Sequence, residues 1–396
     1  MKIAMIGSRG IGSNYGGIER VLDELCPRLA MMDHDVDVYS RPEEALTSRP
    51  ASGSTTKELI QAVPSVDRES SNARACVKSI PVKSFGGKHL ENLSRSMTST
   101  FKALRRYDLI HFHATGPGLL SAVTRIAGQK SVVTIHALDQ QRQKWGPTAK
   151  LSLQLAEHAI TSCADDVTVV SESLRRYLRE KYDCRAHYIP NGVPRKRKVP
   201  AGDFLRRHQL EPGKYFLFAS RLTQEKGCHD LIAAFNKTPT HLKLAIAGGV
   251  GPQDYAGQLK RMADPTRTVF LGHLAGTELA EAFSNAYVFV LPSYIEGMSM
   301  ALLEATAFGV PALVSDIEEN RFVVGDGGFH FAVGNVDSLQ AALTLLTMKP
   351  ELVHEKAQAL ATVPLPDWDE IALRYDRFYR QLCNGTDGNR IGGEEQ

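Results

Sequence analysis

The 396-residue sequence has few cysteines, no large excess of charge of either sign and no long apolar run. Its six cysteines include no Cys-x-x-Cys pair, which argues against a zinc ribbon, a thioredoxin-like site and a disulfide framework and favours reduced thiols. A net charge of +3 is too small for a surface that binds nucleic acid. The longest apolar run, Ala286 to Leu291, is far shorter than the roughly 20 residues that span a bilayer. The amino-terminal residues also lack the apolar stretch of a secretory signal. We therefore expect a cytoplasmic protein, with any membrane contact peripheral.

The charge is distributed unevenly along the chain. Residues 1–192 carry a net charge of +6, and the rest of the chain carries −3. A basic first half suits an anionic membrane surface or phosphate ligands, and an ordinary solvated surface explains it equally well.

Short apolar runs predict two domains of the α/β class. Each run has the length of a buried strand and is separated from the next by enough residues for a helix. The pattern restarts after Pro190-Asn191-Gly192, which predicts two doubly wound parallel sheets. The predicted strands are 2–6, 36–39, 109–112, 132–135 and 167–170 in residues 1–192, and 215–219, 242–247, 269–271, 288–291 and 311–314 in residues 193–367.

The remaining segments are expected to connect or flank the domains. We interpret Pro190 to Pro212 as a linker, although its basic run Arg195–Lys198 also resembles a localisation signal. Residues 43–75 are polar and predict a long surface excursion. Apolar residues at spacings of three and four predict a final helix over 368–383 that joins the first domain, and 384–396 has the composition of a disordered tail.

Two glutamates separated by seven residues carry the most specific signal. Glu296 comes just before a predicted helix that Ser299 caps, and Glu304 lies just over one turn inside it. Gly309 and Pro311 predict the end of that helix. The amino-terminal end of a helix has free N–H groups, so Gly297, Met298 and Ser299 could bind anions or hydroxyls there. The alternative is that Glu304 is a surface residue and that Glu296 only completes the helix cap.

Two cations follow the first strand of the second domain. Arg221 and Lys226 lie in the loop after the predicted strand 215–219, and ligands bind beyond the carboxyl ends of parallel strands. Two cations there could hold a diphosphate and stabilise it as a leaving group. The alternative is a basic loop neutralised by Glu225.

A glycine-rich loop links the first strand to a helix. It runs from Gly7 to Arg20, but Tyr15 stands where a dinucleotide-binding motif needs glycine, which weakens an NADP-dependent oxidoreductase. Gly16 and Gly17 could expose N–H groups to a phosphate or a sugar hydroxyl, or could form a structural turn.

Histidines gather at two predicted strand ends. We expect His111 and His113 to be structural, and His136 to be the better functional candidate. No carboxylate or cysteine stands at zinc-ligand spacing from them. The acidic residues around Asp33 to Asp37 superficially resemble a calcium loop, but Val38 replaces its glycine, so no metal is expected.

In combination, these segments resemble the retaining glycosyltransferases of family 4. The resemblance covers nearly the whole chain and rests on Gly16–Arg20, Asp108–His113, Thr134-x-His136, Val170–Ser173, Pro190–Gly192, Arg221–Gly227 and the glutamate pair. It implies a GT-B architecture, in which two Rossmann-like doubly wound parallel-sheet domains face each other across a cleft. Ser220 and Asp33 stand where the family often has glycine. The segment Arg9–Arg20 is most similar to bacterial transferases of surface-polysaccharide assembly.

The resemblance also implies roles for individual residues. Arg221 and Lys226 would bind the donor diphosphate, and Glu304 would bind the ribose hydroxyls. Glu296, with Gly297, Met298 and Ser299, would hold the donor sugar. His136 would reach that sugar from the first domain, and Tyr15, Gly16 and Gly17 would face the acceptor.

The implied reaction is metal-independent transfer of a hexosyl group from a nucleotide-sugar to a hydroxyl of a glycan or lipid-linked acceptor, with retained anomeric configuration. No cofactor is expected. A front-face substitution fits best, and a double displacement with Glu296 as nucleophile is the alternative. An NADP-dependent oxidoreductase and a noncatalytic nucleotide-sugar-binding protein remain rival functions.

Overall fold

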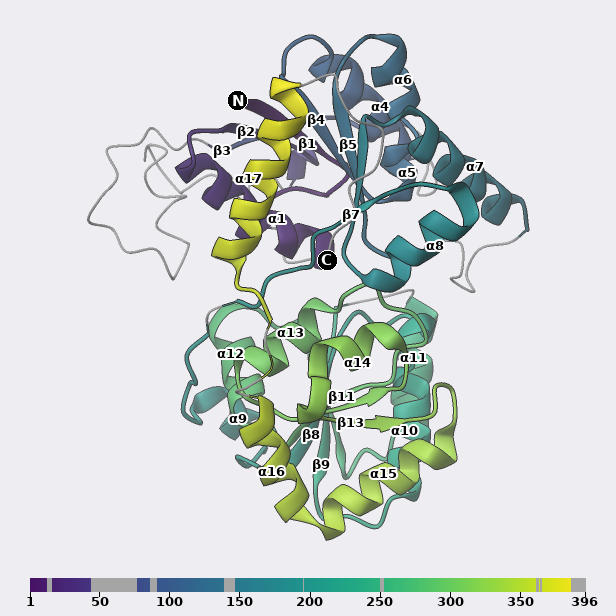
Figure 1. Cartoon of the computed structure of the whole chain (residues 1–396). Helices are drawn as coiled ribbons and strands as arrows, with labels where there is room; N and C mark the ends of the chain where they lie inside the picture. Colours follow the sequence, from purple (N-terminus) through teal and green to yellow (C-terminus); the bar gives the residue numbers. More distant parts are fainter. Residues whose placement is uncertain are drawn as a thin grey trace.

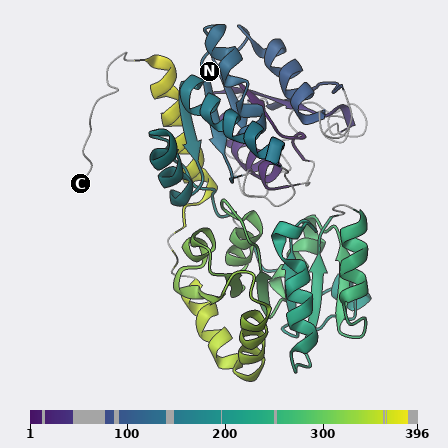
Figure 2. The same cartoon turned by 90° about the vertical axis from the view of Figure 1, so that its right-hand side faces the viewer.

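Two parallel sheets, each covered by helices on both faces, form two lobes stacked one above the other (Figure 1). The structure is a computed structural model that describes residues 1–12, 16–43, 77–85, 91–138, 147–194, 196–249, 253–360, 363 and 365–385. The side view in Figure 2 shows the same two lobes joined at one side. This is the predicted α/β architecture of two Rossmann-like domains.

The first domain contains a seven-stranded sheet in the order β3-β2-β1-β4-β5-β6-β7. All of its strand pairs are parallel, and its central strands are buried on both faces because apolar residues run through them without alternation. The strands are β1 (Lys2–Ile6), β2 (Asp35–Ser40), β3 (Val77–Pro81), β4 (Leu109–His113), β5 (Ser131–Ile135), β6 (Asp166–Val169) and β7 (His187–Tyr188).

Helices cover both faces of this sheet. Helix α17 (Trp368–Asn384) returns from the end of the chain and packs beside α1 (Gly17–Met31), as the yellow helix in Figure 1 shows. Trp368, Ile371, Tyr375 and Phe378 are buried along its apolar face, as predicted from their spacing. The other helices are α4 (Glu91–Ala103), α5 (Thr115–Gly118), α6 (Ser121–Ile126), α7 (Pro147–Cys163) and α8 (Glu172–Tyr182).

The second domain contains a six-stranded parallel sheet in the order β10-β9-β8-β11-β12-β13. Its strands are β8 (Tyr215–Ala219), β9 (Lys243–Ala247), β10 (Thr268–Gly272), β11 (Val288–Leu291), β12 (Ala312–Ser315) and β13 (Gly328–Phe331). Its helices are α9 (Asp203–Arg207), α10 (Cys228–Lys237), α11 (Gln253–Met262), α12 (Gly276–Ser284), α13 (Met300–Ala307), α14 (Glu318–Val324), α15 (Val336–Met348) and α16 (Pro350–Leu360), with short 3₁₀ turns η2 (Gln224–Lys226) and η3 (Gly325–Gly327).

The chain crosses between the domains twice, and the two crossings touch. Val193 N–H donates to the Pro366 carbonyl at 2.9 Å, and Val193 pairs with Asp367 in an isolated parallel bridge. A Cβ atom on Gly192 would lie 2.7 Å from the Trp368 backbone nitrogen, so glycine is required for this approach. The paired crossings hold the sheets with their strand ends facing each other.

All ten predicted strands are confirmed to within one residue at either end, and three strands were missed. The missed strands are β3, β7 and β13, which lie at or near sheet edges, are partly exposed and lack a continuous apolar run. These strands form through backbone hydrogen bonds to a neighbouring strand, which a pattern of apolar residues does not reveal.

The connecting and terminal segments differ in part from the prediction. The linker was predicted too long, because Phe204 and Leu205 are buried in α9 and residues 203–207 therefore belong to the second domain. The tail was predicted to begin one residue too early, because α17 includes Asn384. Of the predicted excursion, only Glu43 is described, and residues 386–396 of the tail also lie outside the described residues. Lys196 to Lys198 are exposed, as expected of a linker, and Arg195 lies outside the described residues.

The acidic segment at residues 33–37 has structural roles. Asp33 has a φ of 63°, a left-handed conformation that explains a preference for glycine at this position. Asp37 lies within β2 and accepts a hydrogen bond of 2.6 Å from the Tyr107 hydroxyl.

Candidate active site

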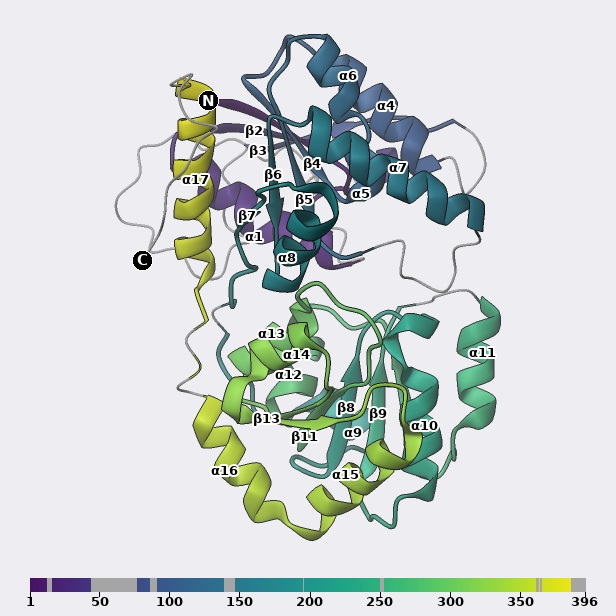
Figure 3. The same ribbon diagram turned by 45° about the vertical axis from the view of Figure 1, so that its right-hand side comes forward.

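The site lies where the strand order of each sheet reverses. In the first sheet β1 and β4 are neighbours, and in the second β8 and β11 are neighbours, while the strands that follow β1 and β8 in the chain lie on their other sides. Ligands of open parallel sheets bind at such points, beyond the carboxyl ends of the strands. In Figure 3 the two sheets present these ends to each other across the gap between the lobes.

Glycine allows the loops at both points to touch. A Cβ atom on Gly7, after β1, would lie 2.2 Å from the carbonyl oxygen of His113 at the end of β4. A Cβ atom on Gly227 would lie 2.0 Å from the carbonyl oxygen of Pro292, after β11, and Gly227 has a φ of +65°. The loop after β8 and the loop after β11 are therefore pressed together.

This contact places Lys226 beside Glu296. Lys226 ends the turn η2, and its Nζ donates to Glu296 Oε1 at 2.6 Å. The side chains are only 12% and 7% exposed. A pair so well shielded from water interacts more strongly than a surface pair. The sequence predicted both residues in the site but not their ion pair.

Arg221 lies two residues beyond the end of β8 and is half-buried. Within the described ranges its guanidinium makes no ion pair or hydrogen bond. Its positive charge therefore has no paired carboxylate among the described residues and lies on the loop that also carries Lys226, an arrangement that suits a diphosphate.

The loop after Glu296 contacts the first domain directly. A Cβ atom on Gly297 would lie 1.6 Å from the His136 carbonyl oxygen, so only glycine fits here. The Asn191 side-chain amide donates to the Met298 carbonyl at 3.2 Å, and the Asn191 backbone N–H lies 3.2 Å from the Met298 sulfur. The linker residue Asn191 thus fixes the loop that precedes α13.

Helix α13 begins and ends as its sequence predicts. Ser299 Oγ accepts a hydrogen bond of 3.4 Å from Leu302 N–H, and Gly309 has a φ of +65° just past the helix. Met298, Ser299 and Met300 are buried at its start, next to the first domain. The amino-terminal end of α13, with its partial positive charge, therefore lies at the interface of the domains.

Glu304 is buried and pairs across the interface with Arg20 of α1. Burial raises the pKa of the Glu304 carboxyl group, against the opposing effect of the positive charges of Arg20 and Lys196. The sequence predicted Glu304 as a binding residue but did not predict that Arg20 would bridge to it.

Three histidines form a row along β4 and past the end of β5: His111 and His113 lie in β4, and His136 follows β5. His113 Nδ1 lies 3.1 Å from His136 Nε2, and the rings of His111 and His113 have centroids 4.1 Å apart. Burial lowers the pKa of His111 to about 3 and that of His136 to about 4, and it lowers the pKa of His113 well below the ordinary value. All three are neutral at neutral pH.

The three histidines differ in their partners. His111 is structural, as predicted, because Nδ1 lies 2.6 Å from the Tyr379 hydroxyl and Nε2 lies 2.6 Å from the Thr134 hydroxyl. His113 Nε2 is buried without a hydrogen-bond partner among the described residues, so the contact of its Nδ1 with His136 is the one polar contact that its ring makes there. His113 therefore positions His136.

The glycine-rich loop faces α13. A Cβ atom on Gly17, the first residue of α1, would lie 3.8 Å from Met300 Cγ. Gly16 precedes the helix in extended backbone, and Glu19 accepts a hydrogen bond of 3.0 Å from Arg9 N–H, which braces the loop. Tyr15, predicted at the same site, lies outside the described residues.

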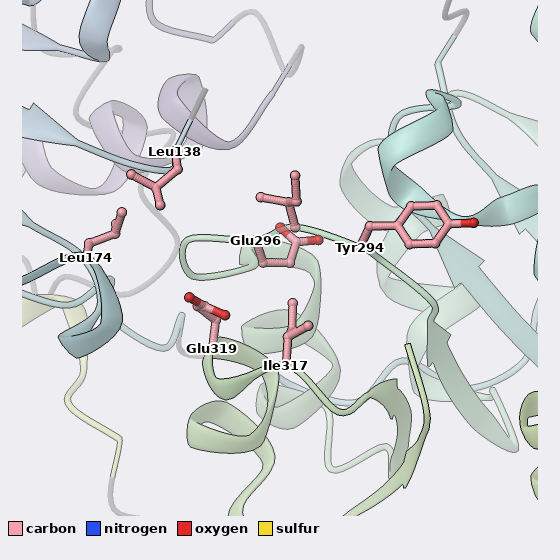
Figure 4. A pocket seen from close by; sticks show the side chains of 7 residues that line it. Leu138, Leu174, Tyr294, Glu296, Ile317 and Glu319 are labelled. Carbon is pink, nitrogen blue, oxygen red and sulfur yellow. The ribbon is translucent and has the colours of Figure 1, made fainter. Parts of the chain in front are cut away.

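A cavity of about 160 Å³ lies between the domains next to Glu296. Figure 4 shows Glu296 between Leu138 of the first domain and Tyr294 of the second. The residues that line the cavity are Leu138, Leu174, Tyr294, Ile295, Glu296, Ile317 and Glu319. Ser173 donates to Glu319 beside it, so both domains close the cavity.

The described residues contain neither a metal-binding cluster nor a membrane-spanning helix. No three His, Cys, Asp or Glu side chains there are grouped so that they could hold a metal ion. Nor does any helix there have both the length and the hydropathy to cross a bilayer.

Two family models match the chain along most of its length. The model described as Glycosyltransferase Family 4 matches residues 15–197, and that described as Glycosyl transferases group 1 matches residues 203–361. The chain belongs to glycosyltransferase family 4. The resemblance predicted from the sequence is confirmed, and the two matching models give no support to the oxidoreductase.

Known relatives of this glycosyltransferase act on several sugars. It is 27% identical to a glycogen synthase of Mycobacterium tuberculosis, over 97% of this chain and 96% of the relative. It is 28% identical to UDP-Gal:alpha-D-GlcNAc-diphosphoundecaprenol alpha-1,3-galactosyltransferase of Escherichia coli, over 64% of this chain and 70% of the relative. Its fold matches sucrose-phosphate synthase from Thermosynechococcus elongatus with a TM-score of 0.75 at 24% identity, over 96% and 99% of the two chains.

Three residues of this glycosyltransferase have positions that the sequence analysis did not anticipate. Arg20, Asn191 and His113 all belong to segments that carry the family resemblance, but their partners lie in other segments or across the interface. The motifs were a signal that these residues matter. Only the folded chain shows what each one contacts.

Proposed function

We propose that this glycosyltransferase transfers a hexosyl group from a nucleotide-diphosphate-sugar to a hydroxyl of a lipid-linked glycan, with retained anomeric configuration and without a metal ion. The observation that carries the proposal is the grouping of Arg221, Lys226 and the start of α13 at one switch point. The name of the Escherichia coli relative supports it, because it specifies a UDP-sugar donor and a diphosphoundecaprenol-linked acceptor.

Departure of the diphosphate is the step that the site assists. As the bond between the sugar and the phosphate breaks, negative charge grows on the leaving oxygen. Arg221 and Lys226 supply positive charge, which Lys226 shares with Glu296, and the free N–H groups at the start of α13 supply a further source of positive potential. In this proposal, these groups neutralise the charge on the diphosphate, as a divalent cation does in other transferases.

Glu296 orients the donor sugar and is not the nucleophile in this mechanism. Its Oε1 accepts the hydrogen bond of Lys226, so the carboxylate is held by the same cation that binds the phosphate. This supports a front-face substitution, in which the acceptor hydroxyl attacks from the side of the departing diphosphate and gives its proton to a phosphate oxygen. Both bond changes occur on one face, and the configuration is retained.

His136 completes the sugar site from the first domain. Its Nε2 faces His113, which leaves Nδ1 to contact a sugar hydroxyl. Because the pKa of His136 is lowered to about 4, the ring binds as a neutral hydrogen-bonding group. Met298 and Ser299 contribute N–H groups near the sugar, and Gly297 allows the loop to reach it.

Glu304 binds the ribose, and Gly16 and Gly17 face the acceptor. Glu304 is bound to Arg20 in this structure, so ribose hydroxyls share the carboxylate with Arg20 or replace it. We place the reaction in the cytoplasm at the inner face of the membrane. The five described cysteines form no disulfide, which agrees with that compartment.

The decisive experiment screens a panel of nucleotide-sugars for release of free nucleotide, with and without lipid extract. We expect release with one donor class, increased by extract, and a glycosylated lipid product detected by mass spectrometry. Binding of donors without release or transfer would favour a noncatalytic nucleotide-sugar-binding protein.

The stereochemistry and the metal requirement need separate measurements. Proton NMR of the product made from an α-linked donor should show an α-anomer, and an inverted product would overturn the retaining mechanism. Activity should persist in EDTA, and restoration of a lost activity by Mg²⁺ or Mn²⁺ would overturn metal independence.

A further inference from the structure

Helix α4 has its apolar side chains on the outside. Leu93, Met97 and Phe101 recur every fourth residue and are 36%, 42% and 59% exposed. Residues at this spacing share one face of a helix. The buried side chains of α4 are Arg95, Ser96, Ser99, Thr100 and Ala103, which are mostly polar. Burial of the apolar face is the usual arrangement, so the outward apolar stripe is not a product of core packing.

The buried polar side chains of α4 all have hydrogen-bond partners in this position. Ser96, Ser99 and Thr100 each donate a hydroxyl hydrogen bond to the carbonyl four residues earlier, at 2.7–2.8 Å. Arg95 donates to the Ser8 carbonyl at 3.2 Å and contacts Glu91. The hydroxyl bonds lie within the helix and would turn with it. Rotation would break the bond from Arg95 to Ser8 and the ion pair of Glu91 with Arg41, so these two contacts hold the stripe outward.

A fourth apolar side chain is fixed next to this stripe. Phe85 is 68% exposed and precedes α4 in the chain. Ser94 Oγ accepts from Phe85 N–H at 3.0 Å and donates to the Phe85 carbonyl at 2.7 Å. These two bonds attach Phe85 to the same helix, although such an exposed aromatic ring gains nothing from the fold itself.

The surroundings of the stripe are strongly basic. Residues 77–107 contain seven lysines and arginines and one acidic residue, Glu91, which is ion-paired with Arg41 and Arg95. Lys102, Arg105 and Arg106 are exposed at the carboxyl end of α4, and Lys83 is exposed two residues before Phe85. An apolar stripe with cations at its border is complementary to an anionic lipid surface, where ring and thioether side chains enter the acyl boundary and cations meet phosphates.

We propose that α4 and Phe85 form a docking surface for an anionic bilayer. The surface consists of Phe85, Leu93, Met97 and Phe101 with the bordering cations. Figure 3 shows α4 in the helical layer with α6 and α7, on the side of the first domain opposite α17. The bond from Arg95 to Ser8 connects α4 to the glycine-rich loop, so docking brings the bilayer to the domain proposed to bind the acceptor. The inference builds on the proposed lipid-linked acceptor.

Vesicle co-sedimentation of the full chain, without donor or acceptor, tests this surface. We expect binding to phosphatidylcholine vesicles that contain phosphatidylglycerol and much weaker binding to phosphatidylcholine alone. The double substitution Met97→Gln/Phe101→Gln should reduce binding about tenfold or more, because it removes most of the apolar contact. Met348→Gln is the matched control, since Met348 is 74% exposed but lies in the second domain. This variant should bind vesicles like the unmodified chain.

The cations are tested in the same assay. Lys102→Gln/Arg106→Gln should remove the preference for phosphatidylglycerol, and raised salt should weaken binding of the unmodified chain. Binding unchanged by the Met97 and Phe101 substitutions would overturn the proposal. The proposal would also be overturned if the unmodified chain bound no vesicles and these substitutions converted a dimer to a monomer. That result would identify α4 as a protein interface.

Failure of this inference is separable from failure of the proposed function. Nucleotide release from the donor in detergent does not require docking, and Met97→Gln/Phe101→Gln should leave it unchanged. Circular dichroism establishes that each variant is folded. Vesicle binding without sugar transfer would therefore refute the proposed function alone, and transfer without vesicle binding would refute the docking surface alone.

Discussion

At the scale of single residues, Gly297 limits how closely the domains can meet. Its Cα faces the His136 carbonyl at a distance that leaves no room for a methyl group. Because the obstacle is backbone rather than a flexible side chain, it cannot move aside cheaply. The contact brings the proposed donor loop against the strand end that carries His136.

Substitution Gly297→Ala should therefore force the domains or the loop apart. We expect turnover to fall on the order of 100-fold, since a displacement of about 1 Å at reacting groups has effects of that size. Steady-state kinetics checks this, and small-angle scattering reports any opening. Gly116→Ala is the control, because a Cβ atom there meets nothing within 4 Å. Equal activity of the two variants would contradict the assignment.

Lys226 should matter for the leaving group more than for folding. Loss of a charged donor to developing negative charge lowers turnover by about 10²–10³-fold, and we expect Lys226→Gln and Arg221→Gln to show this. Arg197→Gln, which removes an exposed linker cation, is the control and should retain nearly full turnover. Equally mild effects in all three variants would exclude this leaving-group mechanism.

At the scale of elements, the two strand–loop–helix units of the second domain supply the site. The unit from β8 to α10 places Arg221 and Lys226, and the unit from β11 to α13 places Glu296 and the helix start. Both loops leave the same edge of a parallel sheet, so the cations of the first loop meet the carboxylate and helix start of the second, although Lys226 and Glu296 are 70 residues apart.

The cap of α13 allows its structural and chemical roles to be separated. Ser299→Ala should cost about 1 kcal/mol of stability through loss of the N-cap bond. It should also lower turnover, because the start of α13 would no longer be held toward the donor. Asn335→Ala removes the equivalent cap of α15, where Asn335 accepts from Ser338 N–H. Thermal melts should show similar losses for both variants, and a similar turnover for both would argue against a role of α13 in the reaction.

Much of the element pattern was predictable, and its exceptions have physical causes. Buried parallel strands need unbroken apolar runs, so runs such as Tyr215–Ala219 were found directly. Strand β3 carries Lys78 and is partly exposed, and its existence depends on hydrogen bonds to β2. Helix α4 has a clear periodicity, but its sequence gives no sign that the apolar face points outward.

At the scale of the whole molecule, the domains are joined by specific polar contacts as well as by the two crossings. Arg20 pairs with Glu304, and Arg176 pairs with Glu318 at 2.5 Å. The first of these contacts involves a residue proposed to bind the donor. Ligand binding and the relative position of the domains are therefore coupled in the proposed mechanism.

The row of buried histidines should make stability depend on pH. His136 has a pKa lowered to about 4, against about 6.5 in the unfolded chain. Below pH 6.5 the unfolded chain takes up a proton that the folded chain does not, so stability falls as pH falls toward 4. This contribution is about 1.4 kcal/mol per pH unit for one histidine. His111 and His113 act in the same direction, and Asp23, whose pKa is raised by burial to about 6, opposes them.

Urea unfolding at pH 7 and pH 5 measures this dependence. The free energy of unfolding should be lower at pH 5 for the unmodified chain, and His136→Asn should reduce the difference between the two pH values. An unchanged difference in His136→Asn would show that His136 titrates alike in the folded and unfolded chains.

The sequence by itself determined the two α/β domains, the positions of ten strands, the capped helix at Ser299 and the family of the chain. These follow from local patterns, in which apolar runs, caps and glycines act within a few residues of one another. Only the tertiary structure decided that Lys226 pairs with Glu296, that Arg20 reaches Glu304, that His113 positions His136 and that α4 turns its apolar face outward. These contacts join residues 23 to 284 positions apart in the chain, or depend on which helix face the sheet already covers. No local pattern encodes such a choice, because it is made by packing of the whole molecule.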